Sequence, residues 1–144
     1  MALTVSRTAE ISGPPTTVHA VLRDLATYEE WMPIVSSVDV DIADHWYVEL
    51  RVAIGPFARS KRLRMKRTTD AADQLVFSRS ESDGRSHATW ELQIELDASD
   101  NSTTVHASLH YEGKMWTPGP VEDALESGLD KGIVQLQEFV SQSM

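Results

Sequence analysis

The stretch "AEISGPPTTVHAVLRDLATYEEWMPIVSSVDV", residues 9–40, joins the end of one strand pattern to a helical pattern and then to a second strand pattern. Pro14 and Pro15 suit the first turn of a helix, where backbone N–H groups have no intrahelical partner. Apolar residues then fall at helical spacing, namely Val18, Val21, Leu22 and Leu25. Pro33 closes a second short helix or turn, because a proline disfavours helical backbone in the residue before it. The stretch therefore predicts a strand, two short helices and another strand.

Strand patterns extend on both sides of this stretch. Upstream, apolar residues at positions 3, 5, 9 and 11 share one face, and Arg7 lies among them. Downstream, residues 34 to 111 alternate in a way that indicates a meander of strands, with turns at "GPF" (55–57) and "DASDNS" (97–102). The large residues on the apolar strand faces include Trp46, Phe77, Trp90 and Tyr111. Arg79 shares the face of Phe77, so two arginines fall on apolar strand faces.

The last segment, "TPGPVEDALESGLDKGIVQLQEFVSQSM" (117–144), predicts one long amphipathic helix. Its apolar residues recur at steps of three and four: Val121, Leu125, Leu129, Ile133, Leu136 and Val140. Gly128 and Gly132 lie on or beside that apolar face, although a glycine inside a helix costs about 1 kcal/mol relative to alanine. Two explanations are open: close packing of the helix on its neighbours, or open space beside it.

Composition excludes several classes of function. A chain of 144 residues suits one domain, residues 1–144. Its formal net charge of −9 disfavours a nucleic-acid partner, since phosphate binding needs a basic excess. The absence of cysteine excludes disulfides and thiolate chemistry. No apolar run approaches the roughly 20 residues of a membrane span, and no metal or phosphate-loop motif is present. We expect a cytoplasmic protein with no metal, no cofactor and no stable membrane insertion.

The stretch "ARSKRLRMKRTT" (58–69) holds nearly half of the basic residues. In a strand, Arg62, Arg64 and Lys66 point to one side, and Leu63 and Met65 point to the other. A hairpin at the "GPF" turn would place Glu49 opposite Arg64 and Tyr47 opposite Lys66. The basic triplet is then a solvated sheet face, with a phosphate or membrane surface and a protein-partner surface as alternatives. If Leu63 and Met65 face the interior, basic neighbours such as Arg67 must reach a rim or meet an acceptor.

The chain resembles the SRPBCC superfamily, which comprises START-like, birch-pollen-allergen-like and polyketide cyclase-like domains. Residues 9–40 look like three features of the family: its first strand, its helix entry and its D-x-x-x-Y-x-x-W-x-P segment. The matching residues are Ile11, Pro14, Val18, Leu22, Asp24, Tyr28, Trp31 and Pro33. The stretch "ATWELQIELDASDNSTTVHASLHY" (88–111) is similar to the family's late hairpin. His19 departs from the aromatic residue that is usual after the valine. The allergen group's glycine-rich loop is absent, so the plant-type ligand set is not carried over.

The resemblance implies an α+β helix-grip fold. In it, a curved antiparallel sheet of about seven strands wraps a long C-terminal helix, two short helices follow the first strand, and a cavity holds apolar molecules such as lipids or polyketides. We expect a ligand there to contact Trp31, Trp46, Phe77, Arg79, Trp90, Tyr111, Trp116, Leu125, Gly128, Leu129 and Ile133. The entrance is expected near Trp31 and Met115–Trp116. Arg79 and Arg7 either reach water at a strand end or orient an oxygen of the ligand.

Three functions remain open at this point. The first is binding or transport of a hydrophobic small molecule, which needs only a cavity and a few polar anchors. The second is a polyketide aromatase/cyclase, for which Arg79, Tyr111 and His19 are the candidate acid–base residues, with no catalytic residue assigned. The third is a protein-interaction module that uses Arg62, Arg64 and Lys66. The first is preferred, because no dense set of acid–base residues marks the predicted interior.

Overall fold

Seven antiparallel strands form one sheet in the computed structural model, which describes residues 2–54, 56–113 and 118–143. The strands are β1 (Ala2–Ser12), β2 (Val35–Val40), β3 (His45–Ile54), β4 (Phe57–Ala71), β5 (Gln74–Arg79), β6 (Thr89–Ala98) and β7 (Ser102–Glu112). Their order is β1-β7-β6-β5-β4-β3-β2, so the first strand pairs with the last and every other pair is a hairpin. The predicted meander is confirmed.

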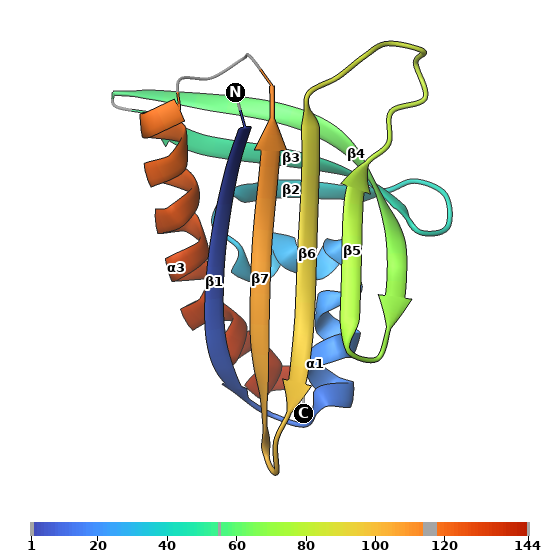
Figure 1. Ribbon diagram of the computed structural model, residues 1–144, viewed down its shortest axis with the longest axis vertical. Coiled ribbons are helices and arrows are strands. Elements are labelled where there is room, and N and C mark those ends of the chain that lie inside the picture. The colour runs from blue at the N-terminus through green and yellow to red at the C-terminus, as the bar shows by residue number, and fades with distance from the viewer. Residues whose placement is uncertain (1, 55, 114–117, 144) are drawn as a thin grey trace.

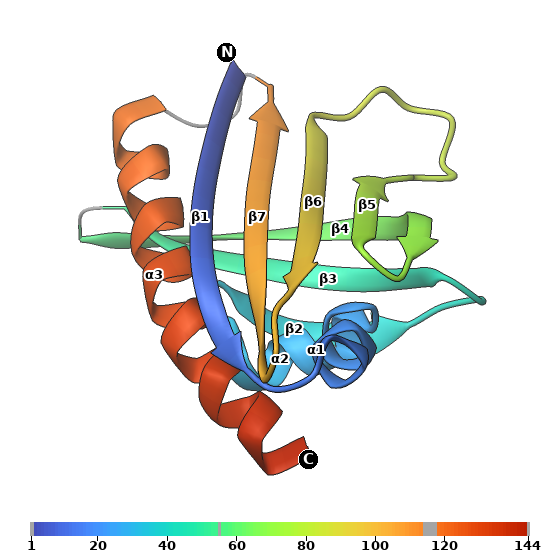
Figure 2. The ribbon, with the colours of Figure 1, turned by 60° about the horizontal axis from the view of Figure 1, so that its bottom comes forward.

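The sheet curves strongly around one long helix. Strands β2, β3 and β4 run across the direction of β1, β7 and β6 (Figures 1 and 2). Helix α3 (Pro118–Ser143) lies along β1 and also contacts β3, and it therefore closes the concave side between the two ends of the sheet. This is the helix-grip arrangement that the sequence predicts. No helix in the described parts of the chain is long and apolar enough to span a bilayer.

Three short helical segments connect β1 to β2. They are α1 (Pro15–Leu22), the 3₁₀ turn η1 (Leu25–Thr27) and α2 (Tyr28–Trp31). Pro15 occupies the first turn of α1, and the carboxylate of Asp24 accepts a hydrogen bond from the Ala26 N–H at the start of η1. Gly13, with φ of 151°, makes the tight connection from β1 into α1. These segments place Met32 and Ile34 against α3.

The apolar faces expected from the sequence meet in one core. Phe77 and Leu125 are fully buried, and Trp90 and Tyr111 are 2% exposed. Arg7, on the same face of β1, lies at the rim, where its Nε donates to Asp130 of α3 at 2.6 Å. The ion pair joins the edge strand to the helix and accounts for an arginine on an apolar strand face.

The expected register of the basic strand is wrong by two residues. Glu49 pairs with Arg62 and Tyr47 with Arg64, because Ile54 pairs directly with Phe57 and Phe57 belongs to the strand instead of the turn. A shift of two residues keeps every side chain on its predicted face. Leu63 and Met65 are buried, so their face is the one that faces the interior.

The predicted solvated face holds for only part of the basic triplet. Arg62 remains exposed and pairs with Asp39 at 3.1 Å, and Lys66 is also exposed. Arg64 is buried instead, because residues 80 and 81 cover it: its guanidinium donates to Asp41 at 3.0 Å and to the Ser80 carbonyl at 2.8 Å. Two of the three cations are therefore neutralised by acids that follow β2 or lie in it.

Two valines on α3 provide a matched test of this packing. Val140 is fully buried and Val134 is 70% exposed. We expect Val140→Ala to lower the free energy of unfolding by about 2 kcal/mol, through lost burial and the space left behind. Val134→Ala should change it by less than about 0.5 kcal/mol. Urea unfolding followed by circular dichroism measures both, and equal effects would contradict the placement of α3.

Candidate functional site

An apolar cavity of about 70 Å³ lies between the concave face of the sheet, α2 and α3. Its lining is Leu25, Tyr28, Met32, Ile34, Val35, Val48, Leu50, Leu63, Met65, Phe77, Trp90, Leu92, Leu109 and Leu129. Tyr28 contributes only its ring, because its hydroxyl donates to the Leu22 carbonyl at 2.9 Å. Burial raises the pKa of the Tyr28 hydroxyl above its ordinary value. The cavity therefore offers carbon and sulfur surface and no ionised group.

The cavity lies over the centre of the sheet, which α3 does not cover. Leu92 of β6 and Leu109 of β7 pair in the register and point to the concave side, yet both are only half-buried. Their neighbours on the same face, Trp90, Ile94 and Tyr111, are buried. Helix α3 passes over the β1 edge of the sheet, so its side chains do not reach these two leucines fully.

Ile34 separates the cavity from a larger groove outside it. The groove has a volume of about 520 Å³ and is lined by Pro33, Ile34, Arg51, Val52, Ala53, Pro120, Asp123, Ala124, Ser127, Gly128 and Lys131. Ile34 is the residue that lines both spaces. Its side chain lies so close to α3 that a Cβ at Gly128 would be 2.4 Å from Ile34 Cγ2. One side chain thus forms the wall between the two spaces at this point.

Close packing explains Gly128 and Gly132 of α3. A Cβ at Gly132 would lie 2.8 Å from Met32 Cε and Sδ, as a Cβ at Gly128 would meet Ile34. The helix approaches the segment 32–34 so closely that a Cβ at either position would require the facing side chain of Met32 or Ile34 to shift. Of the two explanations, close packing therefore applies, and the residues that pack on α3 belong to the segment before β2.

The predicted contact residues fall into several groups. Phe77, Trp90 and Leu129 line the cavity. Trp31, Trp46, Tyr111 and Leu125 are buried but are not among the lining residues. Gly128 faces Ile34 and the outer groove, and Ile133 is half-buried and is not among the lining residues. Trp116, with Met115, lies outside the described residues. Binding of a ligand by this set stays a prediction.

The buried aromatics form the walls behind the cavity. The Trp31 ring lies 4.4 Å from that of Tyr28 between centroids, and the Trp46 ring packs edge-on against Phe77 at 5.9 Å. Trp90 and Tyr111 lie 4.8 Å apart. These contacts fix the orientation of Tyr28, Phe77 and Trp90, whose faces line the cavity.

Arg79 lies in a second, polar pocket of about 240 Å³, on the other side of Trp90. Its side chain is 6% exposed and donates to Glu81 at 3.0 Å and to the Ala88 carbonyl at 3.2 Å. His87 Nδ1 is 3.3 Å from its Nη2. The guanidinium is therefore engaged by the segment 80–88, which folds over the end of β5. It neither reaches bulk water nor lines the apolar cavity.

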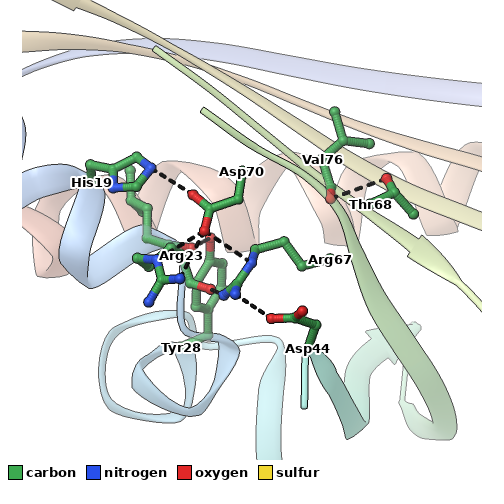
Figure 3. Close-up of polar contacts among 9 residues, drawn as sticks. His19, Arg23, Tyr28, Asp44, Arg67, Thr68, Asp70 and Val76 are labelled. Carbon is green, nitrogen blue, oxygen red and sulfur yellow. Dashed lines mark hydrogen bonds and ion pairs between the residues drawn. The ribbon is translucent and has the colours of Figure 1, made fainter. Parts of the chain in front are cut away.

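His19 belongs to a charged cluster at the end of the molecule that α1 covers. Figure 3 shows His19, Arg23 and Arg67 converging on Asp70. Asp70 accepts from Arg23 at 2.8 Å, and Arg67 Nε is 3.4 Å away. His19 Nε2 is 3.0 Å from Asp70 Oδ1 but is not aligned for a hydrogen bond. We call these four residues the Asp70 cluster.

The Asp70 cluster joins α1 to β4 and to the β2–β3 turn. Arg67, whose side chain is 9% exposed, pairs with Asp44 of that turn and donates to the Arg23 carbonyl at 2.6 Å. Its guanidinium also lies 5.5 Å above the ring of Trp46. The basic residues beside Leu63 and Met65 were expected either to reach a rim or to meet an acceptor, and Arg67 meets acceptors.

Sequence reasoning missed most of the aliphatic lining, including Ile34 and Met32. The alternation of strands β3, β4, β6 and β7 put Val48, Leu63, Leu92 and Leu109 on an inward face. It could not show which part of each face α3 leaves open. For Ile34 and Met32, the available signal was the pair of glycines in the last helix, which indicates that some large side chain approaches it closely.

Comparison with known proteins agrees with this architecture. The model of the polyketide cyclase/dehydrase and lipid transport family matches residues 2–138. A START superfamily protein from Mycobacterium smegmatis is 20% identical, with a TM-score of 0.75 over 98% of this chain and 99% of that chain. A conserved protein from Geobacillus kaustophilus is 14% identical, with a TM-score of 0.77 over 98% and 97%. A comparison with curated proteins gives no significant match.

The Zhui aromatase/cyclase from Streptomyces sp. R1128 is also similar, at 14% identity and a TM-score of 0.64 over 99% of this chain and 94% of that chain. At these identities the structural similarity establishes the fold alone. Together with the family match, it confirms the resemblance drawn from the sequence.

The Asp70 cluster predicts a pH dependence of stability. The hydrogen bond from Arg23 lowers the pKa of Asp70 below its ordinary value of 3.8. Ionised Asp70 therefore stabilises the folded chain above that ordinary pKa, and the contribution is lost as the pH falls through the lowered one. We expect Asp70→Asn to reduce the free energy of unfolding by on the order of 1–2 kcal/mol at neutral pH.

The difference between wild type and Asp70→Asn should shrink as the pH falls below about 4. Urea unfolding at a series of pH values measures it. The exposed Asp100, in the β6–β7 turn, provides the control variant Asp100→Asn, for which little effect is expected. A pH-independent effect of Asp70→Asn would contradict the electrostatic role of the carboxylate.

Proposed function

We propose that this protein, which belongs to the polyketide cyclase/dehydrase and lipid transport family, binds an apolar small molecule between its sheet and α3. The observation that carries the proposal is the lining of the cavity, in which every contributing side chain presents carbon or sulfur. Apolar surface released from water on binding supplies about 25 cal/mol for each Å² buried. A site of this kind favours apolar ligands without selecting among them by hydrogen bonding.

The size of the cavity sets a condition on binding. A volume of about 70 Å³ is smaller than the roughly 150 Å³ of a dry apolar cavity that binds benzene. It is also well below the roughly 300–1,000 Å³ of drug-sized ligand sites. A lipid-sized molecule therefore needs more space. Displacement of Ile34 would join the cavity to the outer groove of about 520 Å³. We propose that the ligand enters there.

The position of the polar candidates supports binding in preference to an aromatase/cyclase reaction. An acid or base must come within about 3 Å of the proton that it transfers. Arg79 is engaged by the segment 80–88, His19 lies in the Asp70 cluster, and Tyr111 packs behind Trp90. None of the three is part of the lining. The basic strand gives no stronger case for a protein partner, since Arg62 and Arg64 are paired with acids.

Filling the cavity should weaken binding without unfolding the protein. We expect the double variant Leu92→Phe/Leu109→Phe to lower the affinity for the neutral dye N-phenylnaphthylamine by about ten-fold or more, because each ring occupies space that the dye needs. Dye fluorescence measures binding, and a thermal melt confirms folding. Val134→Phe, on the exposed face of α3, is the control. Wild-type affinity in the double variant would refute this location of the site.

Removing the wall at Ile34 should have the opposite effect on binding. Ile34→Ala deletes the side chain that separates the cavity from the groove, so the dye should bind faster and at least as tightly. The same change should destabilise the fold by about 2–5 kcal/mol, as other buried large-to-small substitutions do. Stopped-flow fluorescence measures the association rate. A slower rate, with the fold retained, would contradict entry past Ile34.

A further inference from the structure

The groove outside Ile34 carries two cations. Arg51 of β3 and Lys131 of α3 both line it, and both side chains are exposed. Both are also tied to the wall residue. The Arg51 N–H donates to the Ile34 carbonyl at 2.8 Å, and Lys131 lies three residues after Gly128, which contacts Ile34. Residues three apart on a helix share a face. The backbone of Arg51 and the helix face that carries Lys131 therefore both adjoin Ile34, where the groove meets the cavity.

These two charges stand out against their surroundings. The chain has a net charge of −9, and Lys131 is the single basic residue of α3 beside Glu122, Asp123, Glu126, Asp130 and Glu138. Among the residues that the structure describes, neither Arg51 nor Lys131 forms an ion pair, which is also true of Arg59, Lys61, Lys66 and Arg85, whereas the other arginines are paired. Asp130, which precedes Lys131, forms an ion pair with Arg7. Both cations are exposed, and neither has a carboxylate within 4 Å among the described residues.

The net charge of the groove determines which charge on a ligand would match it. Asp123 also lines it, so two positive charges and one negative charge leave a net of one positive charge. A singly charged anion matches that balance better than a doubly charged phosphate does. Arg51 can also donate two parallel hydrogen bonds to a carboxylate, which is a favoured geometry for arginine.

We infer that the ligand is amphipathic: an apolar chain fills the cavity behind Ile34, and a carboxylate at its end lies in the groove between Arg51 and Lys131. This inference rests on the proposed function, since it assigns the second end of the same site. The wholly apolar cavity cannot hold a charged group without a large desolvation cost. The open groove can, because the carboxylate and both cations remain hydrated there. The order of the two spaces therefore fixes the direction of the ligand.

Three probes with the same ten-carbon chain test the assignment: decanoate, decanol and decylamine. Each competes with N-phenylnaphthylamine at neutral pH, in low and in high salt. We expect decanoate to bind most tightly, decylamine least, and the advantage of decanoate to fall in high salt because exposed charges are screened. Arg51→Gln and Lys131→Gln should each weaken decanoate by about three- to ten-fold. Decanol should be unaffected, which shows that the variants keep the cavity intact.

A control variant is Arg85→Gln, which removes an exposed arginine that lies outside the groove; decanoate should bind to it as to wild type. Equal affinities for decanoate and decanol, with no effect of Arg51→Gln or Lys131→Gln, would overturn the carboxylate assignment and leave apolar binding in place. Preference for decylamine would overturn it too and would indicate Asp123 as the anchor. If no probe displaced the dye and the dye itself did not bind, the proposed function would fail, and this inference with it.

Discussion

The contact of Met32 and Ile34 with two glycines of α3 determines the shape of the interior. The long helix lies along the β1 edge of a strongly curved sheet (Figure 2), so its own side chains cannot fill the whole concave face. The segment 32–34 fills part of that gap and can do so because Gly128 and Gly132 carry no Cβ. What remains is the small cavity over Leu92 and Leu109. A glycine inside a helix lowers the stability of that helix. At these two positions the absence of a side chain permits the close approach.

Buried arginines have a structural role in this protein. Arg64, Arg67 and Arg79 each have a side chain that is at most 10% exposed, and each meets a carboxylate and a backbone carbonyl. Such an ion must be paired and hydrogen-bonded to offset its desolvation. These pairs fasten strands β4 and β5 to the segment 80–88, to the β2–β3 turn and to the end of α1. They surround an interior without ionised groups, which is an environment suited to holding an apolar molecule.

Sequence patterns determined most of the fold and part of the site. Alternation placed Trp46, Phe77, Trp90 and Tyr111 on inward faces, and the steps of three and four in the last helix placed Leu125 and Leu129 there; the structure agrees. The side-chain period of a strand makes such assignments insensitive to a shift of two residues. For that reason the wrong register of β3 and β4 left every face correct, although it misplaced the partners of Arg64 and Lys66.

The sequence by itself determined the order of elements, the inward faces and the apolar character of the interior, because these follow from local periodicity and from the burial of apolar surface. The tertiary structure decided which inward residues are left uncovered, because that depends on the angle between α3 and the curved sheet. It also decided that Arg79 is held by residues 80–88, and that Arg51 and Lys131 lie together beside Ile34. Residues from separate elements meet only when the chain folds, and no spacing in the sequence records the distance between them.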